Sequence, residues 1–227
     1  MKHKYLILLA SIGFAANLTA ADLLPVYLGS AGTFAVLSGS TVTNTGPTVV
    51  NGNLGVWPGT AVTGFNEPGE VNGTIYAGVV TAQHAQASLA IAYDDAAGRT
   101  LGAVGVAGDL GGQTLAPGLY KSTSTLAITG DLTLDANGDR NAVFIFQVGS
   151  GLTVASYGRV ILTGGAKAAN VFWQVGSSAT LGTYSAMKGT VMAYASVTIA
   201  TGATLSGRAL AEHAAVTLDS NAVSKPN

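Results

Sequence analysis

Length, composition and charge exclude several classes of protein at once. The chain has 227 residues, only 9% of them charged, and its formal net charge is -1. A chain so weakly charged, with no run of lysine or arginine beyond its first residues, does not suit nucleic acid or an anionic membrane as a partner. There is no cysteine, so disulfides are excluded and stability must come from packing and backbone hydrogen bonds.

Residues 1–20 have the pattern of a secretory signal peptide. Lys2, His3 and Lys4 precede an apolar stretch over residues 5–16, and small residues suited to cleavage follow. A transmembrane anchor is the alternative, but the stretch is short for a bilayer and no stop-transfer pattern follows it. We therefore expect a secreted, extracellular protein with a single domain over residues 21–227.

The first part of that domain repeats a threonine-bearing word. Thr41-Val42-Thr43-Asn44 is followed about 20 residues later by Thr60-Ala61-Val62-Thr63, with Pro-Gly turn signals on either side of the second copy. The alternation predicts two strands of one repeating structure.

Residues 81–98 predict the one clear α-helix. An apolar face is formed at spacings of three and four residues by Ala82, Ala85, Leu89, Ala92, Tyr93 and Ala96, and Gly98 suits the end of a helix. Because the helix interrupts the β words, we expect a discontinuous solenoid, with some coils built before the helix and others after it. The helix should cover one apolar flank.

The second half of the chain repeats an apolar-Thr-apolar word five times. The copies are LTLD at 132–135, LTVA at 152–155, ATLG at 179–182, VTIA at 197–200 and VTLD at 216–219, with threonines 20, 27, 18 and 19 residues apart. Such spacings are typical of a solenoid that lays equivalent strands on one another. Since side chains alternate along a strand, the apolar residues face the core and the threonines face outward.

Each coil also carries a second strand. Residues 189–193 and 207–211 match at a spacing of 18, and residues 146–150 and 173–177 match at 27, where a turn through residues 164–167 lengthens the coil. The sequence therefore predicts a mainly β fold.

Ice contact is predicted for a flat face built on these threonines. Thr133, Thr153, Thr180, Thr198 and Thr217 should form one column, about 4.8 Å from coil to coil, with a small residue or aspartate beside each. The predicted site residues are Thr41, Thr43, Thr60, Thr63, Thr133, Asp135, Thr153, Ala155, Thr180, Gly182, Thr198, Ala200, Thr201, Thr217 and Asp219.

Several longer words give the chain a family resemblance. They are LGSAGTFAVL at 28–37, GNLGV at 52–56, PGTAVTGF at 58–65, DDAA at 94–97, FIFQVG at 144–149, NVFWQVGS at 170–177 and GRALA at 207–211. In this order the chain resembles the microbial ice-binding proteins of the discontinuous β-helix type, over essentially all of residues 21–227.

The resemblance implies a right-handed, three-faced β-helix with one long α-helix alongside, N-terminal strands inserted at one end, and secretion by a cold-adapted microbe. It also implies that one flat face binds ice. Some members carry Thr-Ala/Gly-x-Thr/Asn words there, matched here by residues 60–63 and 201–204. Asp135 and Asp219 depart from an uncharged face, and either weaken ice contact or mark its edge. The implied partners are ice and ordered water, for a monomer without cofactor.

Other classes fit the residues less well. Threonine is common on exposed strands whatever their function, so the repeat alone does not establish an ice-binding face. An enzyme on a β-helix would need converging acidic or basic groups, which are scarce here: Asp94 and Asp95 lie on the helix, and Asp135, Asp139 and Arg140 suit a turn. A secreted β-helix adhesin or glycan-binding module is the remaining alternative. His84 and His213 each stand alone, so no metal site is predicted.

Overall fold

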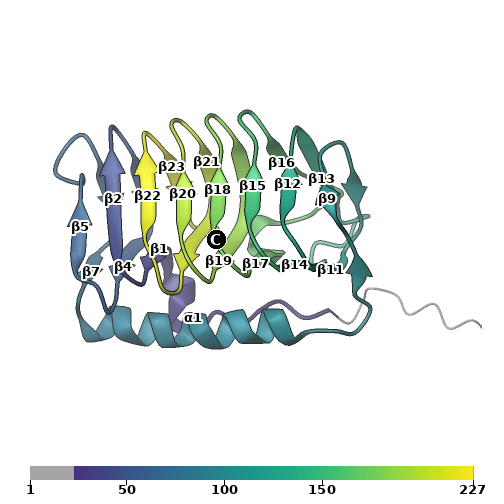
Figure 1. The fold of residues 1–227 in the computed structure, drawn as a ribbon, viewed down its shortest axis with the longest axis horizontal. Helices are drawn as coiled ribbons and strands as arrows, with labels where there is room; N and C mark the ends of the chain where they lie inside the picture. The colour runs from purple at the N-terminus through teal and green to yellow at the C-terminus, as the bar shows by residue number, and fades with distance from the viewer. Residues whose placement is uncertain (1–22, 227) are drawn as a thin grey trace, which may run out of the picture.

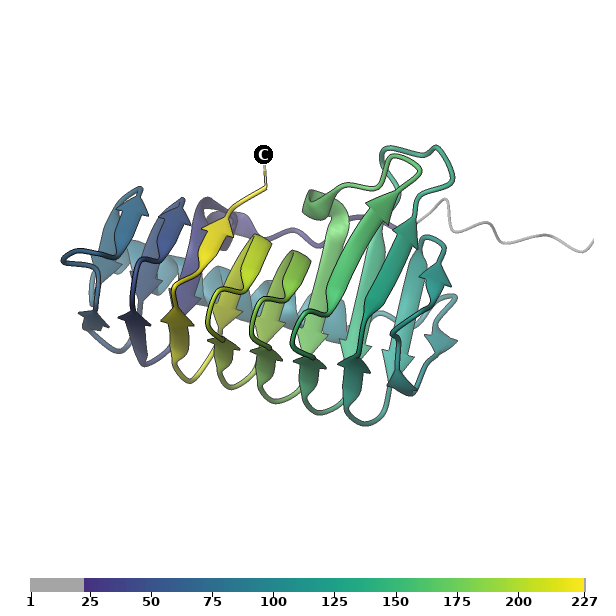
Figure 2. The same ribbon diagram turned by 90° about the horizontal axis from the view of Figure 1, so that it is seen from above.

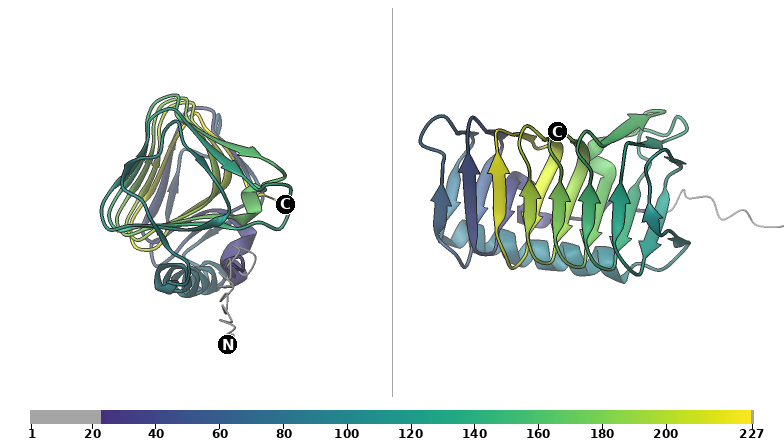
Figure 3. Two further views of the ribbon diagram at one scale, coloured as in Figure 1. Left: turned by 90° about the vertical axis from the view of Figure 1, so that its right-hand side faces the viewer. Right: turned by 45° about the horizontal axis from the view of Figure 1, so that its top comes forward.

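Parallel strands stack coil upon coil into a solenoid, and one long helix, α1 (Val80–Gly98), runs beside it (Figure 1). The structure is a computed structural model and describes residues 23–226, so the signal peptide expected at residues 1–20 lies outside the described residues. Seen end-on, the coils trace a triangle with α1 beneath one side (Figure 3). The expectation of a mainly β, three-faced β-helix with a helix alongside is confirmed.

Three parallel faces make up the solenoid. The first, called the Thr face below, stacks β5 (Ala61–Thr63), β2 (Thr41–Thr45), β22 (Val216–Asp219), β20 (Val197–Ile199), β18 (Ala179–Leu181), β15 (Leu152–Val154), β12 (Leu126–Ile128) and β9 (Gly108–Asp109) in this order. The face covered by α1 stacks β7 (Ile75–Ala77), β4 (Asn53–Val56), β1 (Phe34–Ser38), β21 (Thr204–Ala211), β19 (Ala186–Ala193), β17 (Val171–Val175), β14 (Phe144–Val148), β11 (Gly118–Ser122) and β8 (Val104–Gly105).

The third face contains β6 (Glu70–Asn72), β3 (Val49–Asn51), β23 (Ala222–Ser224), β16 (Arg159–Thr163), β13 (Asp131–Asp135) and β10 (Thr114–Leu115). β19 and β21 are long enough to bend around a corner, and their first residues complete this face. Two short 3-10 helices, η2 (Gly29–Thr33) and η3 (Ala168–Asn170), flank the solenoid. Longer connections project at the end that carries β13 and β16 (Figure 2).

The order of coils along the axis differs from their order in the chain. The N-terminal strands β1 to β7 occupy one end, α1 returns the chain along the solenoid, and the later strands grow back until β22 pairs with β2 and β21 with β1 (Figure 1). The join therefore unites Thr43 with Thr217 and Leu37 with Leu210. The discontinuity predicted from the position of the helix is confirmed.

The core changes in size along the axis because the coils differ in length. Where Leu126, Leu152 and Ala179 follow one another at 26 and 27 residues, aromatic rings fill the interior. Phe146 lies between Tyr120 and Trp173, with ring centroids 5.2 and 3.9 Å apart. In the shorter coils Val191 and Ala209 take the equivalent positions. Side-chain volume thus follows the cross-section, as close packing requires.

Polar side chains attach α1 and η2 to the solenoid. Gln147 donates from Nε2 to the carbonyls of Ala96, Ala97 and Arg99 at 2.7 to 3.1 Å, which satisfies acceptors at the helix end that lack a partner within the helix. Arg208, 8% exposed, donates to the carbonyl of Gly32 in η2. Two of the words that carry the family resemblance therefore serve to position the helical elements.

Glu212, between the solenoid and α1, provides a stability prediction. Burial raises the pKa of its carboxyl, His213 opposes this and Asp94 adds to it, while Oε2 has no hydrogen-bond partner. A carboxyl whose pKa rises on folding destabilises the fold once it is ionised, and this penalty disappears as the pH falls below its unfolded pKa. Glu212→Gln should therefore raise Tm near pH 8 and leave it unchanged near pH ~4.

Thermal unfolding followed by circular dichroism at both pH values checks this prediction. His213→Asn is the control, because it removes the nearby imidazole, with its Nε2 3.7 Å from Oε1, and keeps the carboxyl. A lower Tm for Glu212→Gln near pH 8 would mean that attraction to His213 outweighs burial.

Candidate functional site

Outward-facing threonines align in register along the Thr face. Strand pairing places one side chain from each coil in a column that reads Thr63, Thr43, Thr217, Thr198, Thr180, Thr153, Ala127 and Asp109. The threonines are exposed or half-buried, while their apolar neighbours point into the core. Six consecutive coils thus present the same side chain, at a pitch of about 4.8 Å.

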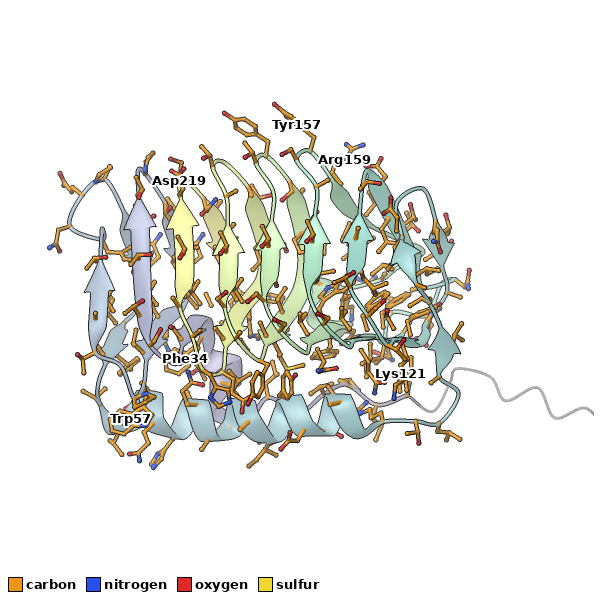
Figure 4. All side chains as sticks on the ribbon, in the orientation of Figure 1. Phe34, Trp57, Lys121, Tyr157, Arg159 and Asp219 are labelled. Atoms are coloured by element: carbon orange, nitrogen blue, oxygen red, sulfur yellow. The ribbon has the colours of Figure 1, made fainter. Side chains whose placement is uncertain are left out.

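Small residues flank this column on both sides. Two positions before the threonines, the chain presents Ala61, Thr41, Ala215, Ser196, Ser178, Gly151 and Thr125. Two positions after them come Thr45, Asp219, Ala200, Gly182 and Ala155. With nothing larger than threonine or aspartate on these coils, the Thr face is flat, and Figure 4 shows short side chains along its strands.

Thr133 and Asp135 do not belong to this surface, which corrects the predicted column. Both lie on β13, where Thr133 pairs with Ile161 on the third face. The coil instead presents Ala127 beside Thr153. The prediction was wrong here because the LTLD word has the same alternation as the Thr-face strands, and its spacing of 20 residues suggested an ordinary coil where the real one has 26.

The remaining predicted residues divide between the flat surface and its corners. Thr43, Thr63, Thr153, Thr180, Thr198 and Thr217 form the column, and Thr41, Ala155, Gly182, Ala200 and Asp219 lie beside it. Thr60 precedes β5, and Thr201 lies in the turn after β20. Ser178, Ser196 and Ala215 were not predicted, although each stands two residues before a column threonine, which was the available signal.

Two carboxylates mark the limits of the column and its flank. Asp219 accepts from Thr201 Oγ1 at 2.5 Å and from Ser220 Oγ at 3.0 Å, so its charge turns toward the corner. Asp109 ends the column, where hydrogen bonds from the Thr129 hydroxyl and from the Gly111 and Thr129 amides hold the pKa of its carboxyl below the usual range. The threonines between them form an uncharged strip.

The chemistry of this surface is that of many weak contacts. A threonine hydroxyl hydrogen-bonds water, and its methyl group disfavours strong local hydration. In the described part of the chain, no three His, Asp or Glu side chains are arranged to hold a metal ion. Within residues 23–226 we also find no helix with the length and apolarity that a bilayer crossing requires. The geometry thus suits an extended, ordered partner.

Residues 36–224 match the model of a family described as Ice-binding-like. The chain belongs to this ice-binding-like family. A protein of Nostoc sp. (strain HG1) named "Ice-binding protein" is 47% identical over 99% of this chain and 83% of its own length. The "Ice-binding protein" of Colwellia sp. is 40% identical over 94% of this chain and 88% of its own.

Solved structures of ice-binding proteins share the fold. One from an Antarctic Biological Consortium is 50% identical and superposes with a TM-score of 0.88, covering 90% of this chain and 93% of that one. Another, from the Antarctic ascomycete Antarctomyces psychrotrophicus, is 42% identical with a TM-score of 0.86, covering 89% and 99%. These relatives are named for ice binding and for no catalysed reaction, and the ice-binding-like family is not a family of enzymes.

Proposed function

We propose that the chain is an ice-binding, antifreeze protein that adsorbs to ice through the Thr face. The observation that carries the proposal is the in-register column of six threonines over consecutive coils. The names of its relatives support the same class of activity. The expected consequences are thermal hysteresis and inhibition of ice recrystallisation.

Flatness, rigidity and lack of charge favour adsorption to ice over binding to a dissolved ligand. Each threonine contributes only a weak contact with ordered water, so the affinity must come from the sum over several coils. The side chains are held by a parallel ladder of backbone hydrogen bonds, so little conformational entropy is lost when the face meets the crystal. The uncharged strip also avoids the strongly hydrated ions that would disturb an ice-like water layer.

Adsorbed molecules then restrain the ice front between them. The front grows into curved segments, and the curvature lowers the temperature at which growth continues. We further propose that the protein is secreted and acts outside the cell as a monomer, with no partner other than ice and its ordered water. The support for secretion is the composition of residues 1–20.

The decisive experiment is to measure thermal hysteresis and ice-recrystallisation inhibition of purified residues 21–227. We expect ice crystals held in this solution to be faceted and to resist growth below the melting point. A folded protein, shown by its circular dichroism spectrum, that leaves ice growth unchanged from bovine serum albumin at equal concentration would contradict the proposal.

A further inference from the structure

A left-handed corner repeats where the chain leaves the Thr face. Tyr157, Tyr184, Gly202, Ser220 and Gly46 have φ angles of 63°, 57°, 68°, 53° and 71°. The coils are joined there by hydrogen bonds from the Tyr184 amide to the Thr201 carbonyl, from Gly202 to Asp219 and from Ser220 to Thr45, at 2.8 to 3.1 Å. Five successive coils therefore turn in the same way.

Two of these coils place tyrosine in a conformation that favours glycine. A bulky residue with positive φ is a backbone outlier, because its Cβ crowds the neighbouring carbonyl. Burial of the ring does not offset this cost, since Tyr157 is 68% exposed and Tyr184 55% exposed. Outliers of this kind cluster at functional sites, where a surface requirement maintains them.

The two rings form a fixed stack beside the Thr face. Their centroids are 5.5 Å apart with an interplanar angle of 26°. The ring of Tyr184 in turn lies over Gly202, because a Cβ added to that glycine would stand 2.5 Å from Tyr184 Cε1. Each ring is thus supported by its neighbour in the next coil. Figure 4 shows Tyr157 projecting from the corner, beyond the ends of the strands.

Both tyrosines belong to coils that contribute central threonines. Tyr157 comes four residues after Thr153, and Tyr184 four residues after Thr180, with only Ala155 and Gly182 as the outward residues between them. These small residues leave the path from threonine to ring unobstructed. The rings therefore continue the surface of the Thr face past its corner, and they do so next to the middle of the column.

We propose that Tyr157 and Tyr184 form an aromatic rim that contacts ice together with the Thr face and widens the adsorbing surface at the centre of the column. This rests on the proposed function. The rings present apolar area with a hydroxyl at the outer edge, the same combination that threonine offers on a smaller scale. The rim is rigid through its stacking, so its contact with ice needs no ordering on adsorption.

The test is the double variant Tyr157→Gly with Tyr184→Gly, compared with the parent chain for thermal hysteresis and Tm. Glycine accepts the left-handed conformation, so we expect Tm to be retained or raised. Hysteresis should fall to about half or less, because the contact area at the centre of the face is reduced. Tyr157→Asn with Tyr184→Asn is a second variant that also tolerates positive φ, with the same expected result.

Two controls make the result specific. The double variant Tyr157→Phe with Tyr184→Phe keeps both rings and should retain most of the hysteresis. Tyr27→Gly removes another exposed ring, 84% exposed and distant from the Thr face in sequence and fold, and should change nothing. A parent-like hysteresis in both the glycine and asparagine variants would overturn the rim. If Thr198→Tyr still abolished activity in that case, the proposed function would stand without it.

Discussion

Thr198→Tyr is expected to abolish most of the thermal hysteresis and to leave the fold intact. Thr198 lies in the middle of the column, between Thr180 and Thr217 in the neighbouring coils. A tyrosine at this position would hold the surrounding threonines away from the ice surface. Since a gap of about 0.5–1 Å already forfeits a quarter to a half of a dispersion contact, we expect hysteresis to fall roughly tenfold or more.

Thr133→Tyr is the matched control for this prediction. It introduces the same ring in place of the same residue type, in a word with the same apolar-Thr-apolar pattern, but on β13 in the third face. Both positions point outward from a strand, so the expected change in stability is similar and small. Only the variant on the Thr face should lose activity.

The measurement is thermal hysteresis of the two variants and the parent at equal concentration, with circular dichroism melting to verify folding. Loss of activity in Thr133→Tyr with retention in Thr198→Tyr would place ice binding on the third face. Equal retention in both would remove Thr198 from the adsorbing surface.

Trp173→Ala is expected to have the largest effect on stability. Trp173 is completely buried, stacks on Phe146 with centroids 3.9 Å apart, and donates from Nε1 to the Lys188 carbonyl at 2.9 Å. Removing so large a buried ring costs about 3–5 kcal/mol. At roughly 2–4 °C per kcal/mol for a domain of this size, Tm should fall by about 6–20 °C.

Trp173→Phe distinguishes the contribution of the stack from that of the indole hydrogen bond. It keeps an aromatic ring against Phe146 and loses only the donor to Lys188, so Tm should fall by less than half as much as in Trp173→Ala. Calorimetric melting of the two variants checks the order. Hysteresis near the melting point of ice should survive in both, since the substitution lies in the core and the Thr face stays assembled at low temperature. A Tm for Trp173→Ala equal to that of the parent would contradict the role of the aromatic core.

The helix and the solenoid could be predicted from local patterns. Apolar residues at spacings of three and four placed a helix at residues 81–98, and the observed α1 begins one residue earlier. The alternation in VTIA and VTLD correctly predicted outward threonines on β20 and β22. Side-chain direction in a strand is a local property with a period of two, so it can be read without knowledge of the partner strands.

The identity of the face was not a local property. The same alternating word occurs on two faces of the solenoid, so the pattern at residues 132–135 could not distinguish β13 from a strand of the Thr face. The side chains that pin α1 and η2, Gln147 and Arg208, lay in words whose role was not visible before their partners were known.

The sequence by itself determined the repeating strand, the outward position of its threonines, the helix and the low charge of the surface, because periodicity and composition act on neighbouring residues. Only the tertiary structure decided which threonines share one column. That choice depends on how many residues each coil uses to go round, which varies between 18 and 27, and on the join of β2 with β22, which unites Thr43 with Thr217. Closure of a coil and pairing across the join are set by how the whole core packs, and no short window of sequence contains that information.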